Sequence, residues 1–266
     1  MAQLELHRQL LERDVLLGQL LEAKAAADAA RERSDVLLRN ILPAQIADEL
    51  KANDRVRPRY HEAATVLFAD FKDSVRLTEM LDPASLVEQL NQNFARFDRI
   101  VEANRLETLK IIGDAYMCVG GVPEPNRTHA IDACLAALQM QKFLRDGNRD
   151  RERLHLAPWE LRIGIRTGSL VAGIVGTRRL TYDVWGNTAN VAQRLQEACE
   201  PGRINVAGST FHQVATRFET EPRGRIEVKH VEPIEMYFLN RIRPDLTADA
   251  EGCLPNDRFW NASGLG

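Results

Sequence analysis

The sequence predicts a mixed α/β (α+β) domain of the ferredoxin-like type, with a mostly antiparallel sheet, preceded by a long N-terminal helix. The first 41 residues contain no proline and are rich in Leu, Ala, Glu and Arg, which is typical of a helix. Between residues 60 and 240, short apolar runs alternate with amphipathic stretches, which indicates strands separated by helices. In that region Gly113 and Asp114 separate two apolar runs, which predicts a hairpin.

The N-terminal segment, residues 1–42, is expected to form a parallel dimeric coiled coil, because its leucines recur at heptad spacing. The alternative is a helix that packs against its own domain, since the alanine-rich stretch from Ala25 to Ala30 weakens the heptad pattern. The leucines concerned are the pairs Leu4/Leu11 and Leu10/Leu17, followed less regularly by Leu20, Leu21, Leu37 and Leu38.

Residues 43–59 are expected to form a short helix and a linker. Pro43 ends the long helix, the stretch AQIADELK is amphipathic, and NDRVRPR is polar. The main domain then occupies residues 60–242. The polar tail, residues 243–266, contains glycine and proline, and no function is assigned to it.

The main domain begins with the order strand, two helices, hairpin, helix, strand. Its second helix has a clear apolar side, formed by Leu86, Leu90, Phe94, Phe97 and Val101. In chain order we predict a strand at 64–70, a helix ending at Leu81, a helix at 83–104, a hairpin at 106–121, a helix at 129–145, a strand at 161–168, a hairpin at 169–176, a helix at 187–199, and strands at 203–208 and 225–239.

Length and composition exclude several classes of protein. With 266 residues and 44% hydrophobic content, the chain can bury a substantial core. A net charge of -3 gives no sign of a nucleic-acid-binding surface. Four cysteines without a CxxC pair argue against a zinc site or a disulfide framework and favour a reducing cytoplasm. Since no apolar run approaches the ~20 residues that a membrane span needs, we expect a soluble chain.

Two aspartates lie where the predicted strands end. Asp70 follows a buried strand, and Asp114 lies in the hairpin turn. Taken singly, Asp70 would cap the next helix and Asp114 would favour the turn. Because the first strand and the hairpin are neighbours in this topology, the two carboxylates are expected to converge. Paired carboxylates suit Mg²⁺ or Mn²⁺, which share oxygen ligands with substrate phosphates.

A second group of polar residues lies in LTYDVWGNTANVAQRL. Asp183 is placed near a strand end, whereas Asn190 and Arg194, four residues apart, project from one side of a helix. Arginine and asparagine in this arrangement can grip a phosphoryl group. An ordinary solvated helix face explains the same spacing equally well.

Together these stretches resemble the successive motifs of the class III nucleotidyl cyclase catalytic domain, in order, from about Ala63 to Leu239. The resemblance implies that such domains dimerise head to tail and form their sites at the shared interface. The stretches that carry it are FADFKDSVRLTEMLDP, TLKIIGDAYMCVGGVP, RIGIRTGSLVAGIVG and YDVWGNTANVAQRL.

The resemblance implies two Mg²⁺ or Mn²⁺ ions per active site, held by Asp70, Asp114 and the backbone carbonyl of Phe71. It also implies that Lys110 donates to adenine N1 and that Asp183 accepts from the exocyclic amine, a pair that suits ATP. The remaining implied roles are orientation of the ribose by Asn190, stabilisation of charge on the α-phosphate by Arg194, and contact with the terminal phosphates by Lys229.

The implied activity is conversion of ATP to 3′,5′-cyclic AMP and pyrophosphate at two equivalent sites of a homodimer. One subunit supplies the metal-binding aspartates, and the other supplies the base, ribose and phosphate contacts. The N-terminal helix then links an upstream sensor to the catalytic domain, as in the cytoplasmic portion of a longer receptor. The alternatives are a guanylyl cyclase, in which a glutamate is expected in place of Lys110, and a non-catalytic nucleotide-binding dimerisation module.

Some positions depart from the family pattern. Asp73, Ser74 and Val75 stand where many members have glycine, phenylalanine and threonine, and Asp73 places a negative charge near the phosphates. His230 replaces the glycine that usually follows the lysine matched by Lys229. Asp183, in place of threonine or serine, groups the chain with the Asp-bearing cyclases.

Overall fold

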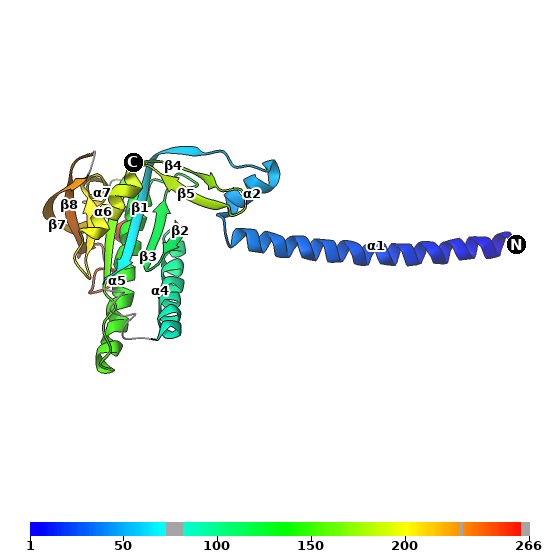
Figure 1. Cartoon of the computed structure of the whole chain (residues 1–266), viewed down its shortest axis with the longest axis horizontal. Coiled ribbons are helices and arrows are strands. Elements are labelled where there is room, and N and C mark those ends of the chain that lie inside the picture. Colours follow the sequence, from blue (N-terminus) through cyan, green and yellow to red (C-terminus); the bar gives the residue numbers. More distant parts are fainter. Residues whose placement is uncertain (73–81, 229–230, 262–266) are drawn as a thin grey trace. The chain divides into compact units, whose positions relative to one another are not determined.

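The computed structural model describes residues 1–72, 82–228 and 231–261 (Figure 1). The chain divides into two compact units, Met1–Val56 and Arg57–Gly266. The predicted helix ending at Leu81, and with it the unusual residues Asp73, Ser74 and Val75, lies outside the described residues. Lys229 and His230 lie outside them as well.

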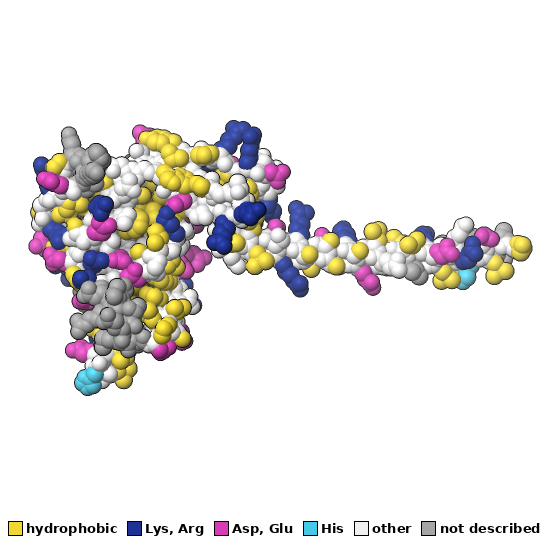
Figure 2. All heavy atoms as spheres, in the orientation of Figure 1, with side chains coloured by type: hydrophobic (Ala, Val, Ile, Leu, Met, Phe, Trp, Pro, Cys, Tyr) yellow, Lys and Arg dark blue, Asp and Glu magenta, His cyan; other side chains and the backbone are white. Residues whose placement is uncertain are grey.

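The first unit contains the two predicted helices, α1 (Ala2–Arg39) and α2 (Ala44–Asn53). Pro43 is the N-cap of α2, and an ion pair of 2.7 Å between Lys51 and Asp35 joins the helices. Figure 2 shows hydrophobic side chains along α1, between charged ones. In the described part of the chain, no helix is both long and apolar enough to cross a bilayer. The exposed leucines of α1 include Leu4, Leu11, Leu16, Leu17, Leu20, Leu21 and Leu37.

One sheet organises the second unit, in the order β2-β3-β1-β4-β6-β8-β7, with β5 paired to β4. All the neighbouring strands pair antiparallel except β4 and β6. The mixed fold and the mostly antiparallel sheet are therefore confirmed. The strands are β1 (Arg59–Phe71), β2 (Leu106–Ile112), β3 (Ala115–Gly120), β4 (Leu161–Val175), β5 (Thr181–Trp185), β6 (Ile204–Ala207), β7 (Phe218–Val228) and β8 (Val231–Ile242).

Helices cover both faces of this sheet. On one face α4 (Pro83–Ala103) and α5 (His129–Arg153) lie side by side, as Figure 1 shows, and they close the main core around aromatic side chains such as Phe71, Phe94 and Phe97. On the other face α6 (Asn187–Glu197) packs against β4 and β1. The short helices α7 (Gly208–Val214) and α8 (Asp257–Asn261) complete the unit.

The alternation of side chains along β4 explains how both faces are packed. Ile163 and Ile165 belong to the main core, whereas Gly164 between them faces α6. A Cβ atom at Gly164 would overlap the backbone nitrogen of Gln196 and the carbonyl oxygen of Ala192. The missing side chain therefore allows the helix backbone to rest directly on the strand.

The predicted hairpin at residues 169–176 is wrong. The segment from Ser169 to Val175 continues β4, and the chain turns only afterwards, at Gly176, whose φ is 103°. Two glycines of β4 have packing roles, because a Cβ at Gly168 would meet Thr188 and one at Gly173 would meet Pro58. The hairpin is thus formed by β4 and β5.

The tail contributes to the core in its described part. Leu246, Cys253 and Phe259 are buried within the main hydrophobic cluster. The backbone carbonyl of Phe259 accepts a hydrogen bond of 3.2 Å from Nε of Arg217, which is itself buried. The polar composition of the tail gives no sign that it packs in the core, because only a few of its apolar residues make these contacts.

Substituting Gly164 by alanine is expected to destabilise the chain, because the added methyl group forces α6 away from β4. Overpacking of this kind costs roughly 1–3 kcal/mol. Gly147→Ala is the matched control: this glycine is exposed within α5, and an added Cβ would meet nothing within 4 Å, so alanine should stabilise by about 0.5–1 kcal/mol. Urea unfolding followed by circular dichroism measures the stability of both variants against that of the wild type. Equal midpoints for the two variants would contradict the close approach of α6.

Candidate active site

Lys110 and Asp183 form a direct ion pair. Nζ of Lys110 lies 2.5 Å from Oδ2 of Asp183, although the residues are far apart in sequence. β2 supplies the lysine and β5 supplies the aspartate, from the middle of the strand and not from its end as predicted. The lysine side chain is 33% exposed and the aspartate 17%. A hydrogen-bond donor and an acceptor are therefore presented together at a partly exposed surface.

Asp70 and Asp114 lie close together where β1 ends and the β2–β3 hairpin turns, as predicted. Asp70 pairs with Ala115, the residue that follows Asp114. The hairpin turn that carries Asp114 begins at Gly113, which has a φ of 65° and suits a two-residue loop with glycine first. Burial raises the pKa of Asp70, and the negative charge of Asp114 raises it further. The two carboxylates therefore interact electrostatically.

Two further residues contact Asp70. Arg162 Nη2 donates to Oδ2 of Asp70 at 2.5 Å, and Gln196 Nε2 donates to the same oxygen at 3.1 Å. Neither residue was predicted from the sequence. Arg162 is the cross-strand partner of Asp70 on β4, so the strand register would have revealed it. The contact of Gln196 depends on how α6 packs against the sheet, for which the sequence spacing gives no signal.

Asn190 and Arg194 are exposed on α6 and contact neither aspartate of their own chain among the described residues. Arg194 has 62% of its side chain exposed, and it forms an ion pair of 2.5 Å with Glu197 of the same helix. The structure therefore groups the predicted residues into an aspartate pair, a lysine-aspartate pair and an exposed helix face.

Phe71 is the last residue of β1, directly after Asp70. Its ring is 2% exposed and packs edge-on against Trp159 with centroids 4.7 Å apart. This packing anchors the end of the strand that carries Asp70. Metal binding by the backbone carbonyl of Phe71 stays a prediction. Contact between Lys229 and the terminal phosphates stays one as well.

The aspartate pair has the donor chemistry of a site for a hard divalent cation. Both contacts of Asp70 with described residues involve Oδ2, which leaves Oδ1 for another ligand. A cation placed between the carboxylates would relieve their repulsion. The described residues contain no group of three or more His, Cys, Asp and Glu that could hold a metal. Within the part of the chain that the structure describes, the aspartate pair therefore leaves room for backbone oxygen atoms, substrate or water as further ligands.

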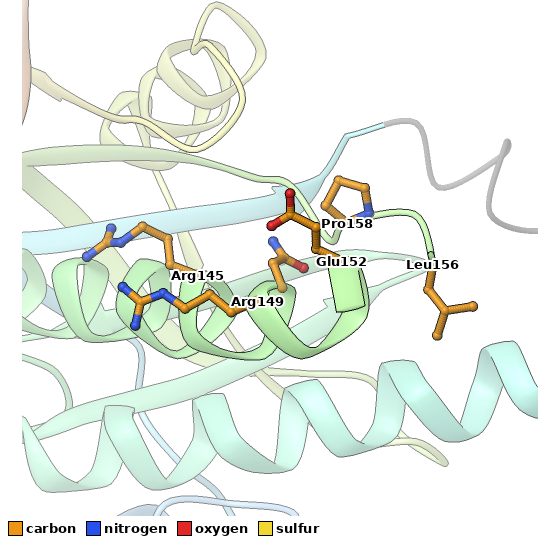
Figure 3. A pocket seen from close by; sticks show the side chains of 6 residues that line it. Arg145, Arg149, Glu152, Leu156 and Pro158 are labelled. Carbon is orange, nitrogen blue, oxygen red and sulfur yellow. The ribbon is translucent and has the colours of Figure 1, made fainter. Parts of the chain in front are cut away.

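A cavity of about 510 Å³ lies elsewhere, at the end of α5. Figure 3 shows Arg145, Arg149 and Glu152 on the helix, and Leu156 and Pro158 on the segment that follows. None of the predicted site residues lines it. The ionic and hydrogen-bonding geometry, and not this cavity, identifies the candidate active site.

Much of the chain is similar in sequence to known proteins. Residues 56–241 match the family model described as "Adenylate and Guanylate cyclase catalytic domain". An adenylate cyclase of Mycobacterium bovis is 37% identical over 219 residues, which are 82% of this chain and 48% of that protein. The soluble guanylate cyclase gcy-34 of Caenorhabditis elegans is 32% identical over 216 residues, 80% of this chain and 31% of that protein. The chain thus spans about half the length of such relatives, or less.

Solved structures agree with the sequence comparison. The adenylyl cyclase CyaB from P. aeruginosa matches 72% of this chain and 100% of its own, with a TM-score of 0.68 and 26% identity. The catalytic core of a rhodopsin-guanylyl cyclase with converted specificity, in complex with ATPalphaS, matches 69% of this chain and 98% of its own, with a TM-score of 0.64 and 26% identity. The chain therefore belongs to the adenylate and guanylate cyclase catalytic domain family, the class III nucleotidyl cyclases.

Proposed function

We propose that the chain is an adenylyl cyclase, which converts ATP to 3′,5′-cyclic AMP and pyrophosphate at two sites shared between the subunits of a homodimer. The ion pair of Lys110 and Asp183 is the observation that carries the choice of ATP. Adenine offers an acceptor at N1 and a donor at its exocyclic amine, which match an ammonium and a carboxylate lying side by side. Guanine in the same pose reverses both groups, so each contact would become repulsive.

The arrangement of α6 supports a shared site. Asn190 and Arg194 project from the exposed side of this helix, whereas its buried side contacts Asp70. A nucleotide bound at Asp70 and Asp114 of one chain therefore meets the ribose and phosphate contacts only if a second chain provides them. One chain carries all these residues, so a symmetric dimer contains two equivalent sites.

Asp70, Asp114 and the Phe71 carbonyl would hold two Mg²⁺ or Mn²⁺ ions, which supply Lewis acidity at the reacting oxygens and the triphosphate. The remaining work is positioning and charge stabilisation. Lys110 and Asp183 fix the base, Asn190 orients the ribose, and Lys229 is assigned to the terminal phosphates. Arg194 stabilises the charge that develops on the α-phosphoryl group.

In the proposed reaction, the ribose 3′-oxygen attacks the α-phosphorus. The new P–O bond closes the cyclic phosphodiester, and the bond to the β-phosphate oxygen breaks to release pyrophosphate. The hydroxyl proton is lost to solvent, so no group remains on the protein.

The guanylyl cyclase alternative keeps the same chemistry with GTP, and it is favoured by the names of several relatives. The lysine at position 110 argues against it.

We also propose that α1 forms a parallel coiled coil that brings two catalytic domains together. Most of its leucines whose side chains the structure describes are exposed within a single chain, and apolar side chains repeated along one helix are typical of a surface that a second helix covers. Upstream signals would then reach the active sites through this coil.

Mixing two inactive variants tests the shared site. Asp114→Ala and Arg194→Ala homodimers should each make no cyclic AMP from ATP, because both of their sites lack an essential group. Random mixing should restore about a quarter of the wild-type rate, since half of the dimers are mixed and each contains one intact site. Mixing Asp114→Ala with Asp70→Ala is the control and should restore nothing. If the first mixture stays as inactive as the control, the site is not shared.

The substrate is tested separately, with wild-type chain. Cyclic GMP made from GTP in preference to cyclic AMP from ATP would favour the guanylyl cyclase alternative.

Removal of residues 1–42 tests the role of α1. The truncated chain should dimerise more weakly in sedimentation velocity and should lose activity at low protein concentration, because the coil no longer holds the domains together. Activity should return at high concentration, where the catalytic domains meet by mass action. Unchanged sedimentation and turnover would mean that α1 is only a spacer.

A further inference from the structure

The two sides of α6 face different environments. Gln196 is only 4% exposed and faces the sheet, where its Nε2 donates to Oδ2 of Asp70. Asn190 and Arg194 lie on the opposite side and are exposed. Because each helical residue advances the direction by about 100°, Gln196 lies about 200° around the axis from Arg194. One short helix therefore contacts the aspartate of its own chain and presents the catalytic face that a second chain would use.

Gln196 and Arg162 hold Asp70 in different ways. The guanidinium of Arg162 carries a positive charge, so it competes with a divalent cation for the carboxylate. The amide of Gln196 is neutral, and it fixes the carboxylate orientation without that competition. Both donors use Oδ2 and leave Oδ1 for another ligand. Carboxylates that bind metals are commonly oriented by hydrogen bonds of this kind.

The close contact at Gly164 restricts where the backbone of Gln196 can lie. The backbone of α6 rests on β4 beside Gln196, and it could not approach so closely over a larger residue. The packing therefore holds the Cα atom of Gln196 at a defined distance from β4. Because β1 pairs with β4 at Asp70, the side-chain amide of Gln196 starts from a defined position relative to that carboxylate. Such packing suits a residue that must hold another side chain in one position.

We propose that Gln196 is a positioning residue that orients the Asp70 carboxylate for a divalent cation. In the homodimer each α6 thereby serves both active sites: Gln196 acts on the site that contains its own Asp70, and the opposite side of the helix acts on the other. The assignment of the helix to two sites rests on the proposed function. The hydrogen bond to Asp70 does not.

Mn²⁺ binding tests the positioning role directly. Gln196→Met keeps the length and much of the volume of the side chain but removes the donor. Gln193→Met, on the exposed side of the same helix, is the matched control. With a non-reactive ATP analogue present, electron paramagnetic resonance of free Mn²⁺ should show binding weakened by about 10-fold or more in Gln196→Met only. Circular dichroism and sedimentation establish that the fold and the dimer persist. Equal Mn²⁺ binding in both variants and the wild type would overturn the proposal.

Mixed dimers separate positioning from a general disturbance of α6. In the mixture of Asp114→Ala and Arg194→Ala chains, the Arg194→Ala chain supplies the aspartates of the one intact site. Gln196→Met on that chain should raise the Mn²⁺ concentration for half-maximal rate by about 10-fold. The same change on the other chain should leave this concentration unaltered. Equal effects from both placements would mean that Gln196 acts only through helix structure. An inactive parent mixture would contradict the shared site, while the Mn²⁺ binding experiment would still decide the role of Gln196.

Discussion

The packing of α6 against β4 at Gly164 is the constraint on which the rest of the site depends. Because no side chain separates the two backbones, the helix has one buried side that reaches Asp70 and one exposed side that carries Asn190 and Arg194. A helix held further from the sheet would lose the first contact. A helix rotated about its axis would bury the exposed side. The proposed division of labour between two chains depends on this single contact.

Electrostatics then gives the aspartate pair its chemical character. Burial and the neighbouring charge of Asp114 both disfavour the ionised form of Asp70, whereas Arg162 and Gln196 favour it. The balance leaves a carboxylate that is oriented yet not fully neutralised by its own chain. A divalent cation would offset the remaining negative charge, which supports the proposed phosphoryl chemistry with metal ions.

Sequence patterns predicted the elements that depend on residues close together in the chain, and the order of the strands predicted one contact between them. The long helix and the convergence of Asp70 and Asp114 followed from composition and strand order. The pairing of Lys110 with Asp183 came only from the family resemblance, because spacing cannot reveal a contact between β2 and β5. Arg162 and Gln196 were missed since their contacts depend on register and on helix packing. The predicted hairpin at residues 169–176 is wrong because β4 continues through this segment, where Gly173 packs closely against Pro58 and forms no turn.

The central claim is that two copies of this chain form an adenylyl cyclase. The most direct measurement is the rate of cyclic nucleotide formation from ATP and from GTP, with Mn²⁺, over a wide range of chain concentrations. We expect cyclic AMP from ATP, at a rate per chain that rises with concentration and then levels as dimers saturate. A rate per chain that is constant down to concentrations where sedimentation shows monomers would contradict the claim. A preference for GTP, or no product with either nucleotide, would contradict it as well.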